Sequence, residues 1–184
     1  MEVSDLSMMT ALANDPRIRA MVVGWDWMVA NSNQEEWLRN SSQSLTTRRL
    51  TIVEKNSGRP IGVTGLWDLD WHNRGALTAI KLLPGNGIRG AGSDAIMLIN
   101  AWSFLEVGLH RLYSSILPFN HSSFKAYVDR CGWTVEGRER ESVFRNGRWH
   151  DLIRVAILAS DFQAHPDADE YSSYVFPEGT VPRN

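Results

Sequence analysis

PGNGIRGAGSDA, residues 84–95, is the stretch of this 184-residue chain that decides the fold. An apolar run at 76–83, typical of a β-strand, precedes it, and an amphipathic run at 93–107, typical of a helix, follows it. Because glycine lacks a Cβ, the four glycines in this stretch let the main chain turn its N–H groups into a concave surface. The N-terminus of the following helix adds about half a positive charge to that surface. The stretch therefore predicts a binding site for a phosphate or diphosphate group.

Three glycine-rich signatures compete for this loop. Residues 85–90 match the dinucleotide pattern G-x-G-x-x-G, and Glu106 lies where a ribose-binding acid would follow. That pattern belongs after the first strand of alternating βαβ units, whereas this loop follows strands joined by short turns. The second signature is the P-loop of nucleotide-binding proteins, and its G-K-[ST] ending is absent here. The third signature, Q/R-x-x-G-x-G/A, is the diphosphate loop of acetyl-CoA-dependent acyltransferases, and residues 87–92 fit its glycine spacing, with Gly87 in place of the usual Gln or Arg. A glycine-rich helix cap without a ligand is a further alternative.

The second half of the chain carries a longer set of motifs. From Leu109 it reads LHRLYSSILPFNHSSFKAYVDRCGWTVEGRERESVFRNGRWHDLIRVAILASDF. This stretch resembles the GNAT N-acetyltransferases, in particular the branch that holds the ribosomal-protein acetyltransferases and spermidine N-acetyltransferase. Their pattern is a strand that ends in Asn, a helix with N-x-x-S/A-x-x-x-Y, a G-[FW]-x-x-E-G turn and a hairpin with N-G-x-[YW]-x-D. The matching positions are Asn120, Ser123, Tyr127, Gly132, Trp133, Glu136, Gly137, Asn146, Gly147, Trp149 and Asp151.

The resemblance implies the α+β fold of the GNAT acyl-CoA N-acyltransferases, in which helices flank a mixed, mostly antiparallel sheet. The hydrophobic pattern predicts helices at 5–13, 33–40 and 93–107 and strands at 49–54, 61–67 and 76–83. Relatives begin with a strand before the first helix, whereas this chain reaches that helix almost at once, so we expect the first strand to be short, absent or supplied otherwise. We expect a single GNAT acetyltransferase domain over 1–164 and a C-terminal tail extension over 165–184.

The composition excludes several classes of protein. A formal charge of −2 and a pI of about 6.2 argue against a nucleic-acid-binding surface. No apolar run approaches the ~20 residues of a membrane span, and the first residues lack the basic start and apolar core of a signal peptide. The single cysteine, Cys131, rules out an internal disulfide and is typical of a reducing cytoplasm. The five histidines are scattered without the spacing of a zinc site, so no metal is expected.

The resemblance implies acetyl-CoA as the cofactor. It assigns the diphosphate to the main chain of the glycine loop, namely Gly87, Ile88, Arg89, Gly90, Ala91, Gly92 and Ser93. Main-chain groups of Leu82 and Leu83 would bind the pantetheine arm and polarise the thioester carbonyl. Asn120 would bind the same arm, and Ser123, one helical turn further on, would lie beside the cofactor at the catalytic centre.

Tyr127 is the general acid that the resemblance implies. Acetyl transfer from a thioester to an amine needs a neutral amine, a donor for the carbonyl oxygen and a proton for the leaving thiolate. Tyr127 lies seven residues past Asn120, two turns along one helix face, where its phenol could protonate the sulfur. The alternative is a core tyrosine on an amphipathic helix. Residues 76–80 hold no acid where many relatives carry a Glu that serves as the general base. Asp26, Asp68, Asp70 and His72 are the candidates by position, with exposed loop residues as the alternative, and a water chain could equally take the proton.

Aromatic and acidic residues predict the acceptor side of the site. Relatives build this side from the segments that here hold Trp25, Asp26, Trp67, Asp70 and His72. Aromatic faces beside carboxylates can hold a cationic amine, although core packing and exposed loops are the alternatives for these residues. Leu77 stands where polyamine enzymes carry acidic residues, which counts against spermidine specifically.

The sequence therefore predicts a cytoplasmic N-acetyltransferase that moves the acetyl group of acetyl-CoA directly to a primary amine. The preferred acceptor is a small molecule, such as a metabolite or a polyamine-like or antibiotic-like amine, with no nucleic-acid or membrane partner. Acetylation of a protein N-terminus, as in the ribosomal-protein enzymes, is the second alternative. A non-catalytic acyl-CoA-binding module is the alternative from another class, favoured by Gly87 and the acid-free third strand. Relatives often dimerise, so a homodimer is expected.

Overall fold

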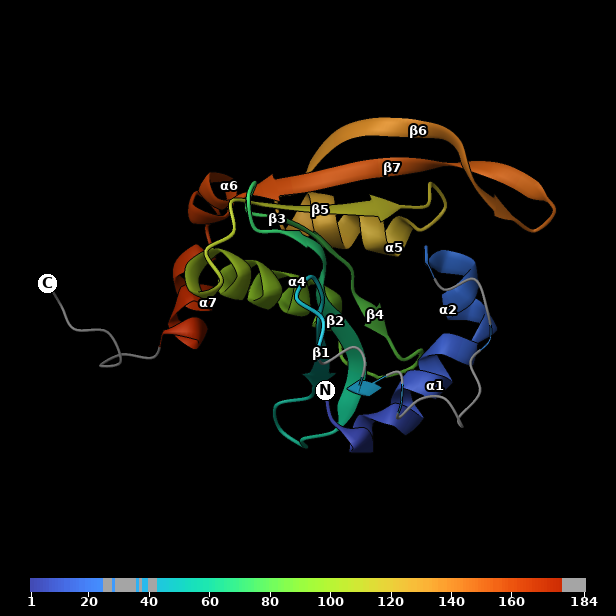
Figure 1. Ribbon diagram of the computed structural model, residues 1–184, viewed down its shortest axis with the longest axis horizontal. Coiled ribbons are helices and arrows are strands. Elements are labelled where there is room, and N and C mark those ends of the chain that lie inside the picture. Colours follow the sequence, from blue (N-terminus) through green and yellow to red (C-terminus); the bar gives the residue numbers. More distant parts are fainter. Residues whose placement is uncertain (25–27, 29–35, 37, 40–42, 177–184) are drawn as a thin grey trace, which may run out of the picture.

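The computed structural model of the protein describes residues 1–24, 28, 36, 38–39 and 43–176 (Figure 1). The helix expected at 33–40 lies mostly outside these residues. In chain order the elements are the 3-10 helix η1 (Val3–Asp5), α1 (Leu6–Asn14), α2 (Pro16–Met21), β1 (Arg48–Val53), β2 (Pro60–Asp70), β3 (Gly75–Thr78), β4 (Lys81–Leu82), α4 (Ala91–Ala101), the π-helix η3 (Trp102–Glu106), β5 (Arg111–Ile116), α5 (His121–Phe124), the π-helix η4 (Lys125–Arg130), β6 (Thr134–Arg145), β7 (Arg148–Leu158), α6 (Ala159–Gln163) and α7 (Ala168–Val175).

One sheet organises the fold, with different helices on its two faces. Within the described residues the sheet has seven strands. Six of them follow the order β1-β2-β3-β5-β7-β6, and the seventh, β4, pairs with β2 beside this path. Neighbouring strands are antiparallel except β3 and β5. Val63 of β2 belongs to a small apolar cluster with Met8, Met9 and Leu12 of α1, whereas Leu66 belongs to the main core with α4. The expected α+β fold with a mixed, mostly antiparallel sheet is confirmed, and no strand precedes β1 within the described residues.

The stretch expected as one strand at 76–83 is divided into two short strands. β3 pairs with β5 in parallel over Gly75–Leu77. β4 pairs with β2 alone, and the second half of β5, residues 114–116, pairs with β7 alone. The prediction of a single strand was wrong, because residues 79–80 do not belong to a strand: both halves pair with β2, but only β3 also pairs with β5. β4 and the second half of β5 therefore diverge, and we call the place between them the opening.

Gly62 lets β4 lie close to β2. A Cβ on this residue would lie 2.4 Å from the main-chain oxygen of Lys81 and 2.7 Å from the Leu82 side chain. Real Cβ atoms do not approach a main-chain oxygen so closely, so a larger residue would push the two strands apart. The missing side chain therefore helps to hold β4 on β2 and away from β5.

Two of the α-helices continue as π-helices. The helix expected at 93–107 is α4, which begins at Ala91 and passes into η3. α5 passes into η4 in the same way, and the Cys131 N–H donates to the carbonyl of Ala126, five residues earlier, at 3.2 Å. π-helical turns are rare and occur frequently at functional sites. Tyr127 lies within η4.

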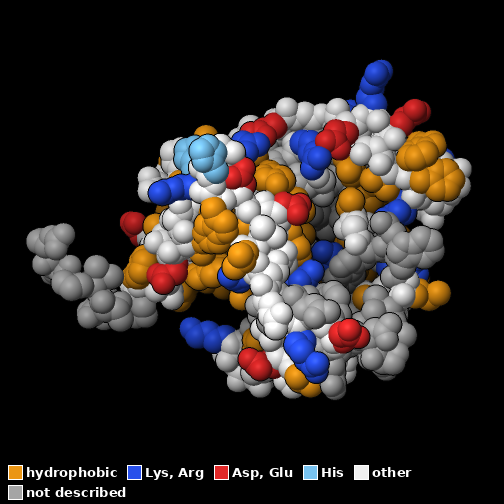
Figure 2. Space-filling model, in the orientation of Figure 1, with side chains coloured by type: hydrophobic (Ala, Val, Ile, Leu, Met, Phe, Trp, Pro, Cys, Tyr) orange, Lys and Arg blue, Asp and Glu red, His pale blue; other side chains and the backbone are white. Residues whose placement is uncertain are grey.

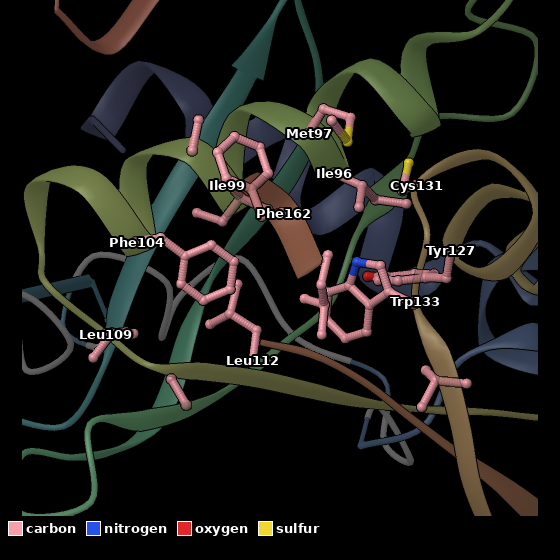
Figure 3. Packing of buried hydrophobic residues seen from close by; sticks show 14 of the residues in the cluster. Ile96, Met97, Ile99, Phe104, Leu109, Leu112, Tyr127, Cys131, Trp133 and Phe162 are labelled. Atoms are coloured by element: carbon pink, nitrogen blue, oxygen red, sulfur yellow. The ribbon is translucent and has the colours of Figure 1, made fainter. Parts of the chain in front are cut away.

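The main core packs around a buried tryptophan (Figure 3). Trp133 is 2% exposed, and its ring meets the Tyr127 ring edge-on, with 4.8 Å between centroids. With the Asn100 amide oriented so that its nitrogen donates to the Ile96 carbonyl at 3.2 Å, its oxygen accepts from Trp133 Nε1 at 3.3 Å. The indole N–H is thus satisfied, and the ring fixes one side of Tyr127.

The C-terminal segment expected as a tail includes a packed helix. Ala168 of α7 is buried in the main core, and Tyr171 packs against that core. The Tyr171 hydroxyl donates to Oδ1 of Asp94, in the first turn of α4, at 2.8 Å. α7 therefore supports the N-terminal turn of the helix that follows the glycine loop.

The surface carries an exposed aromatic pair on the hairpin β6–β7. Phe144 and Trp149 are 52% and 58% exposed, and their rings meet edge-on with 5.4 Å between centroids. Figure 2 shows hydrophobic side chains gathered near the end of this hairpin. Within the described ranges, every helix is too short or too polar to cross a membrane.

Candidate active site

The glycine loop presents main-chain N–H groups at the start of α4. Gly90 caps this helix with a left-handed backbone, φ +86°. Asn86 shapes the loop, because its side chain donates to the Leu83 carbonyl at 3.0 Å and accepts from the Ile88 N–H at 2.9 Å. Five amides in the loop have no hydrogen-bond acceptor among the described groups, those of Gly87, Arg89, Gly90, Gly92 and Ser93. Unpaired amides at a helix N-terminus form an anion site, which fits the diphosphate of CoA.

A substitution of Gly90 tests this assignment. Alanine in the left-handed region costs about 1 kcal/mol and would turn the loop amides away from one another. A Cβ at this position meets no protein atom within 4 Å, so packing does not oppose it. We expect Gly90→Ala to raise the Kd for CoA about tenfold, measured by calorimetry. Gly147→Ala is the matched control, since Gly147 has φ +75° in the distant β6–β7 turn, and an equal loss of CoA affinity in both variants would contradict the assignment.

The main chain of β4 faces the opening through Leu82. The Leu83 N–H donates to the Ile61 carbonyl on β2 at 2.8 Å. Because main-chain groups of successive strand residues point to opposite edges, the N–H and C=O of Leu82 face away from β2, toward the opening. Of the two residues expected to bind the pantetheine arm, Leu82 therefore has its N–H directed there, whereas the N–H of Leu83 is engaged within the sheet.

Tyr127 lies at the opening on the α4 face of the sheet. Its side chain is 3% exposed, and its hydroxyl has no hydrogen-bond partner of good geometry among the described groups. Burial raises the pKa of Tyr127 well above its ordinary value, and the nearby Ser114 hydroxyl and Ile80 main chain offset this only in part. Ile80 precedes β4 and Ser114 begins the second half of β5, so the hydroxyl lies between the diverging strands. A buried hydroxyl without a partner fits a site that a bound group completes, and the sulfur of CoA fits there.

Asn120 and Ser123 lie at the start of the helix that carries Tyr127. The Asn120 Oδ1 accepts from the Ser123 N–H at 3.1 Å, which caps α5. The Asn120 Nδ2 donates to the Met21 carbonyl at the end of α2, at 2.9 Å. The Asn120 side chain is thus engaged at both ends within the protein, and Ser123 is half-buried beside it.

A lysine that the sequence reasoning missed lies on the other face of the sheet. Lys81 pairs with Val63 across β4 and β2, so its side chain shares the α1 face with Val63. Its ammonium lies 5.4 Å from the centroid of the Trp67 ring, and the side chain is 7% exposed. Burial, and then the charge of Arg49, lower the pKa of Lys81 to about 8. The signal was present as a single lysine inside the apolar run AIKLL, residues 79–83.

Asp70 and His72 lie in the turn that joins β2 to β3. The Asp70 carboxylate accepts from the N–H groups of His72 and Asn73, both at 2.9 Å, and from the Asn73 side chain at 2.7 Å. These bonds, with the Asn73 main chain first, lower the pKa of Asp70. Asp70 ends β2, three residues along the strand from Trp67, which is about 10 Å. Trp25 and Asp26 lie outside the described residues.

A cavity of about 1280 Å³ adjoins the glycine loop. It touches Arg89, Gly90 and Ser93 and extends along α4 to Tyr171 of α7. Tyr127 does not line it. The cavity thus lies at the diphosphate end of the site, apart from the place expected for the thioester.

These features coincide with a known family. A family model described as an acetyltransferase (GNAT) domain matches residues 1–134, more than half of the chain. The protein belongs to the GNAT acetyltransferases, and the resemblance seen in the motifs is confirmed.

Individual relatives agree with this assignment. The chain is 28% identical to the spermidine N(1)-acetyltransferase of Vibrio cholerae over 127 residues, which are 69% of this chain and 73% of that protein. It is 28% identical to the putative ribosomal N-acetyltransferase YdaF of Bacillus subtilis over 109 residues, 58% of this chain and 57% of that protein. The crystal structure of the Vibrio cholerae spermidine N-acetyltransferase in complex with CoA and spermine matches with a TM-score of 0.80 at 25% identity, over 88% of this chain and 94% of that one. The protein is therefore an N-acetyltransferase that uses acetyl-CoA, as the motifs predicted.

Proposed function

We propose that this protein transfers the acetyl group of acetyl-CoA directly to a primary amine of a small molecule. The observation that carries the proposal is the buried, unpartnered hydroxyl of Tyr127 at the opening where the Leu82 main chain also points. The similarity to an enzyme named for spermidine acetylation supports a polyamine-like aliphatic amine as the acceptor class.

The residues divide the chemistry between them. Acetyl-CoA supplies the acetyl group as a thioester. The amides of the glycine loop hold the diphosphate, and the Leu82 N–H donates to the carbonyl oxygen, where negative charge develops during the reaction. Tyr127 gives its proton to the sulfur as the thiolate leaves. Because burial raises the pKa of Tyr127, the phenol carries this proton throughout the neutral pH range.

The acceptor side favours some small amines over others. Spermidine N-acetyltransferase of Vibrio cholerae has been crystallised with spermine, a flexible aliphatic amine, which supports the same general class here. Leu77 of β3 is apolar and half-buried where polyamine enzymes carry acids. We therefore place aliphatic amines with few charges ahead of spermidine among the acceptors.

A panel of amines tests the proposal. Initial rates of thiol release from acetyl-CoA would be measured with aliphatic monoamines, diamines, spermidine, spermine and short peptides with free N-termini. We expect turnover of at least one small amine at a kcat/KM well above that of any peptide. Turnover of peptides alone would instead favour the protein N-terminal activity suggested by the similarity to YdaF. Binding of CoA without turnover of any amine would favour a non-catalytic module.

Two further expectations stay predictions. The exposed pair Phe144 and Trp149, together with the free edge of β6, supports a homodimer, because exposed aromatic patches and open strand edges are common at interfaces. The buried, reduced Cys131 supports a cytoplasmic location.

A further inference from the structure

The opening is flanked by titratable side chains on both faces of the sheet. Tyr127 reaches it from the α4 face, near Ile80 and Ser114. Lys81 directly follows Ile80 and directly precedes Leu82, and its side chain points to the α1 face. A thioester bound at the Leu82 main chain would therefore have a phenol on one side and a lysine on the other. The mechanism above uses the first and leaves the second without a role.

We infer that Lys81 Nζ takes the proton of the acceptor ammonium before acetyl transfer. This inference rests on the proposed function and adds to it the base that residues 76–80 do not provide. An acceptor that approaches from the face opposite Tyr127 meets Lys81, while the leaving sulfur lies toward Tyr127. Base and acid are then separated by the sheet, so the two protons move on different faces.

The surroundings of Lys81 suit a lysine that exchanges a proton. Trp67 covers it with an aromatic ring, and Met8, Met9 and Leu12 bring no charge to this face from α1. On β1, Arg49 is the described cation that acts on it. With a pKa of about 8, about one tenth of Lys81 is neutral at pH 7 and half at pH 8.

Other charged groups on this face have hydrogen-bond partners of their own. The Asp5 carboxylate accepts from the Thr51 hydroxyl at 2.6 Å, on β1. On the far side of the opening, Arg154 of β7 is paired with Glu139 at 2.7 Å. Tyr113 of β5 alternates onto the same face, and burial raises its pKa, so it stays neutral.

The proton and electron balance closes with these groups. Neutral Lys81 Nζ accepts one proton from R–NH₃⁺, which leaves a lone pair on the amine nitrogen. That lone pair forms the C–N bond to the carbonyl carbon, and the C–S electron pair leaves on the sulfur. Tyr127 protonates the sulfur, and the remaining extra proton on the amide nitrogen restores the phenol through solvent. Lys81 then releases its proton to water, so the net reaction yields amide, CoA thiol and one proton.

The competing role for Lys81 is that of a fixed positive charge that only stabilises the carbonyl oxygen. A substitution by arginine distinguishes this role from that of a proton acceptor. Lys81→Arg keeps a cation but cannot be deprotonated at working pH. Lys81→Met removes both charge and basicity while it keeps a similar length. Lys125→Met is the matched control, because Lys125 is an exposed lysine of η4 that does not line the cavity at the diphosphate end of the site.

The experiment compares these proteins as full chains with the best amine of the panel. We expect Lys81→Met and Lys81→Arg each to lower kcat at neutral pH about 10²-fold, while the Kd for CoA by calorimetry stays within about twofold. The wild-type rate should rise with pH through about 8, because the neutral lysine is the active form, and both variants should lose this rise. Lys125→Met should match the wild type, and thermal melting would confirm that each variant is folded.

The outcomes that overturn the inference are distinct from those that overturn the function. A wild-type rate and pH profile in Lys81→Arg, or in Lys81→Met, would exclude Lys81 as the proton acceptor while the N-acetyltransferase remains. If Lys81→Arg does not fold, Lys81→Met alone decides. A wild-type protein that binds CoA and acetylates no amine would overturn the proposed function, and the role of Lys81 with it.

Discussion

Replacement of Tyr127 by phenylalanine is expected to lower kcat by about 10²- to 10⁴-fold, the usual contribution of a positioned general acid. The variant loses only the hydroxyl, which is buried at the opening without a partner, and keeps the ring that packs edge-on against Trp133. Folding should therefore be unaffected or slightly improved, because an unsatisfied buried hydroxyl is removed. The measurement is kcat and KM for acetyl-CoA and for the amine, with the Kd for CoA determined separately.

The control for this substitution is another tyrosine. Tyr174→Phe removes a hydroxyl from half-exposed Tyr174 of α7, away from the opening, and should leave kcat unchanged. A loss confined to kcat in Tyr127→Phe marks an interaction made during the chemical step. An unchanged kcat would show that Tyr127 is a core tyrosine, the alternative that its amphipathic helix also allows.

Replacement of Trp133 by alanine is expected to lower the free energy of unfolding by about 3–5 kcal/mol. The indole is 2% exposed, contacts Tyr127 and hydrogen-bonds to Asn100, so its loss leaves a large cavity and an unpaired amide. Urea unfolding followed by circular dichroism would measure the change as a shift in midpoint at constant slope.

Trp71→Ala is the matched control for this experiment. Its side chain is 54% exposed in the turn that joins β2 to β3, and surface substitutions usually change stability by less than about 0.5 kcal/mol. If both variants lose the same stability, Trp133 does not hold the core in the way its burial indicates.

The motifs located the cofactor end of the site because they are local. The glycine loop, the cap residue Asn120 and the position of Tyr127 each lie within one short segment, where spacing alone defines geometry. The break between β3 and β4 could not be seen in this way, because it depends on which distant strand each half pairs with. The same long-range pairing brings Lys81 beside Trp67, and no local pattern encodes that contact.

On the acceptor side, a local turn signal was present in the sequence but was not used. Asp70 was expected to face a cationic amine because of its charge and its aromatic neighbours. Its carboxylate accepts from the following N–H groups, as Asp does in many turns, and its contact with an amine stays a prediction. The run DWHNRG, residues 70–75, contains that turn signal, and it could have been preferred over a functional role from the sequence itself.

The π-helical turn around Tyr127 makes the direction of its phenol depend on the number of residues in this segment. In an α-helix each residue advances the side-chain direction by about 100°. Loss of one residue between Tyr127 and Cys131 would rotate Tyr127 by about that angle relative to Cys131 and Trp133. The phenol could then not point between the strands while the following residues kept their places in the interior. Insertions and deletions in this segment should therefore be as rare among working enzymes as replacements of the tyrosine itself.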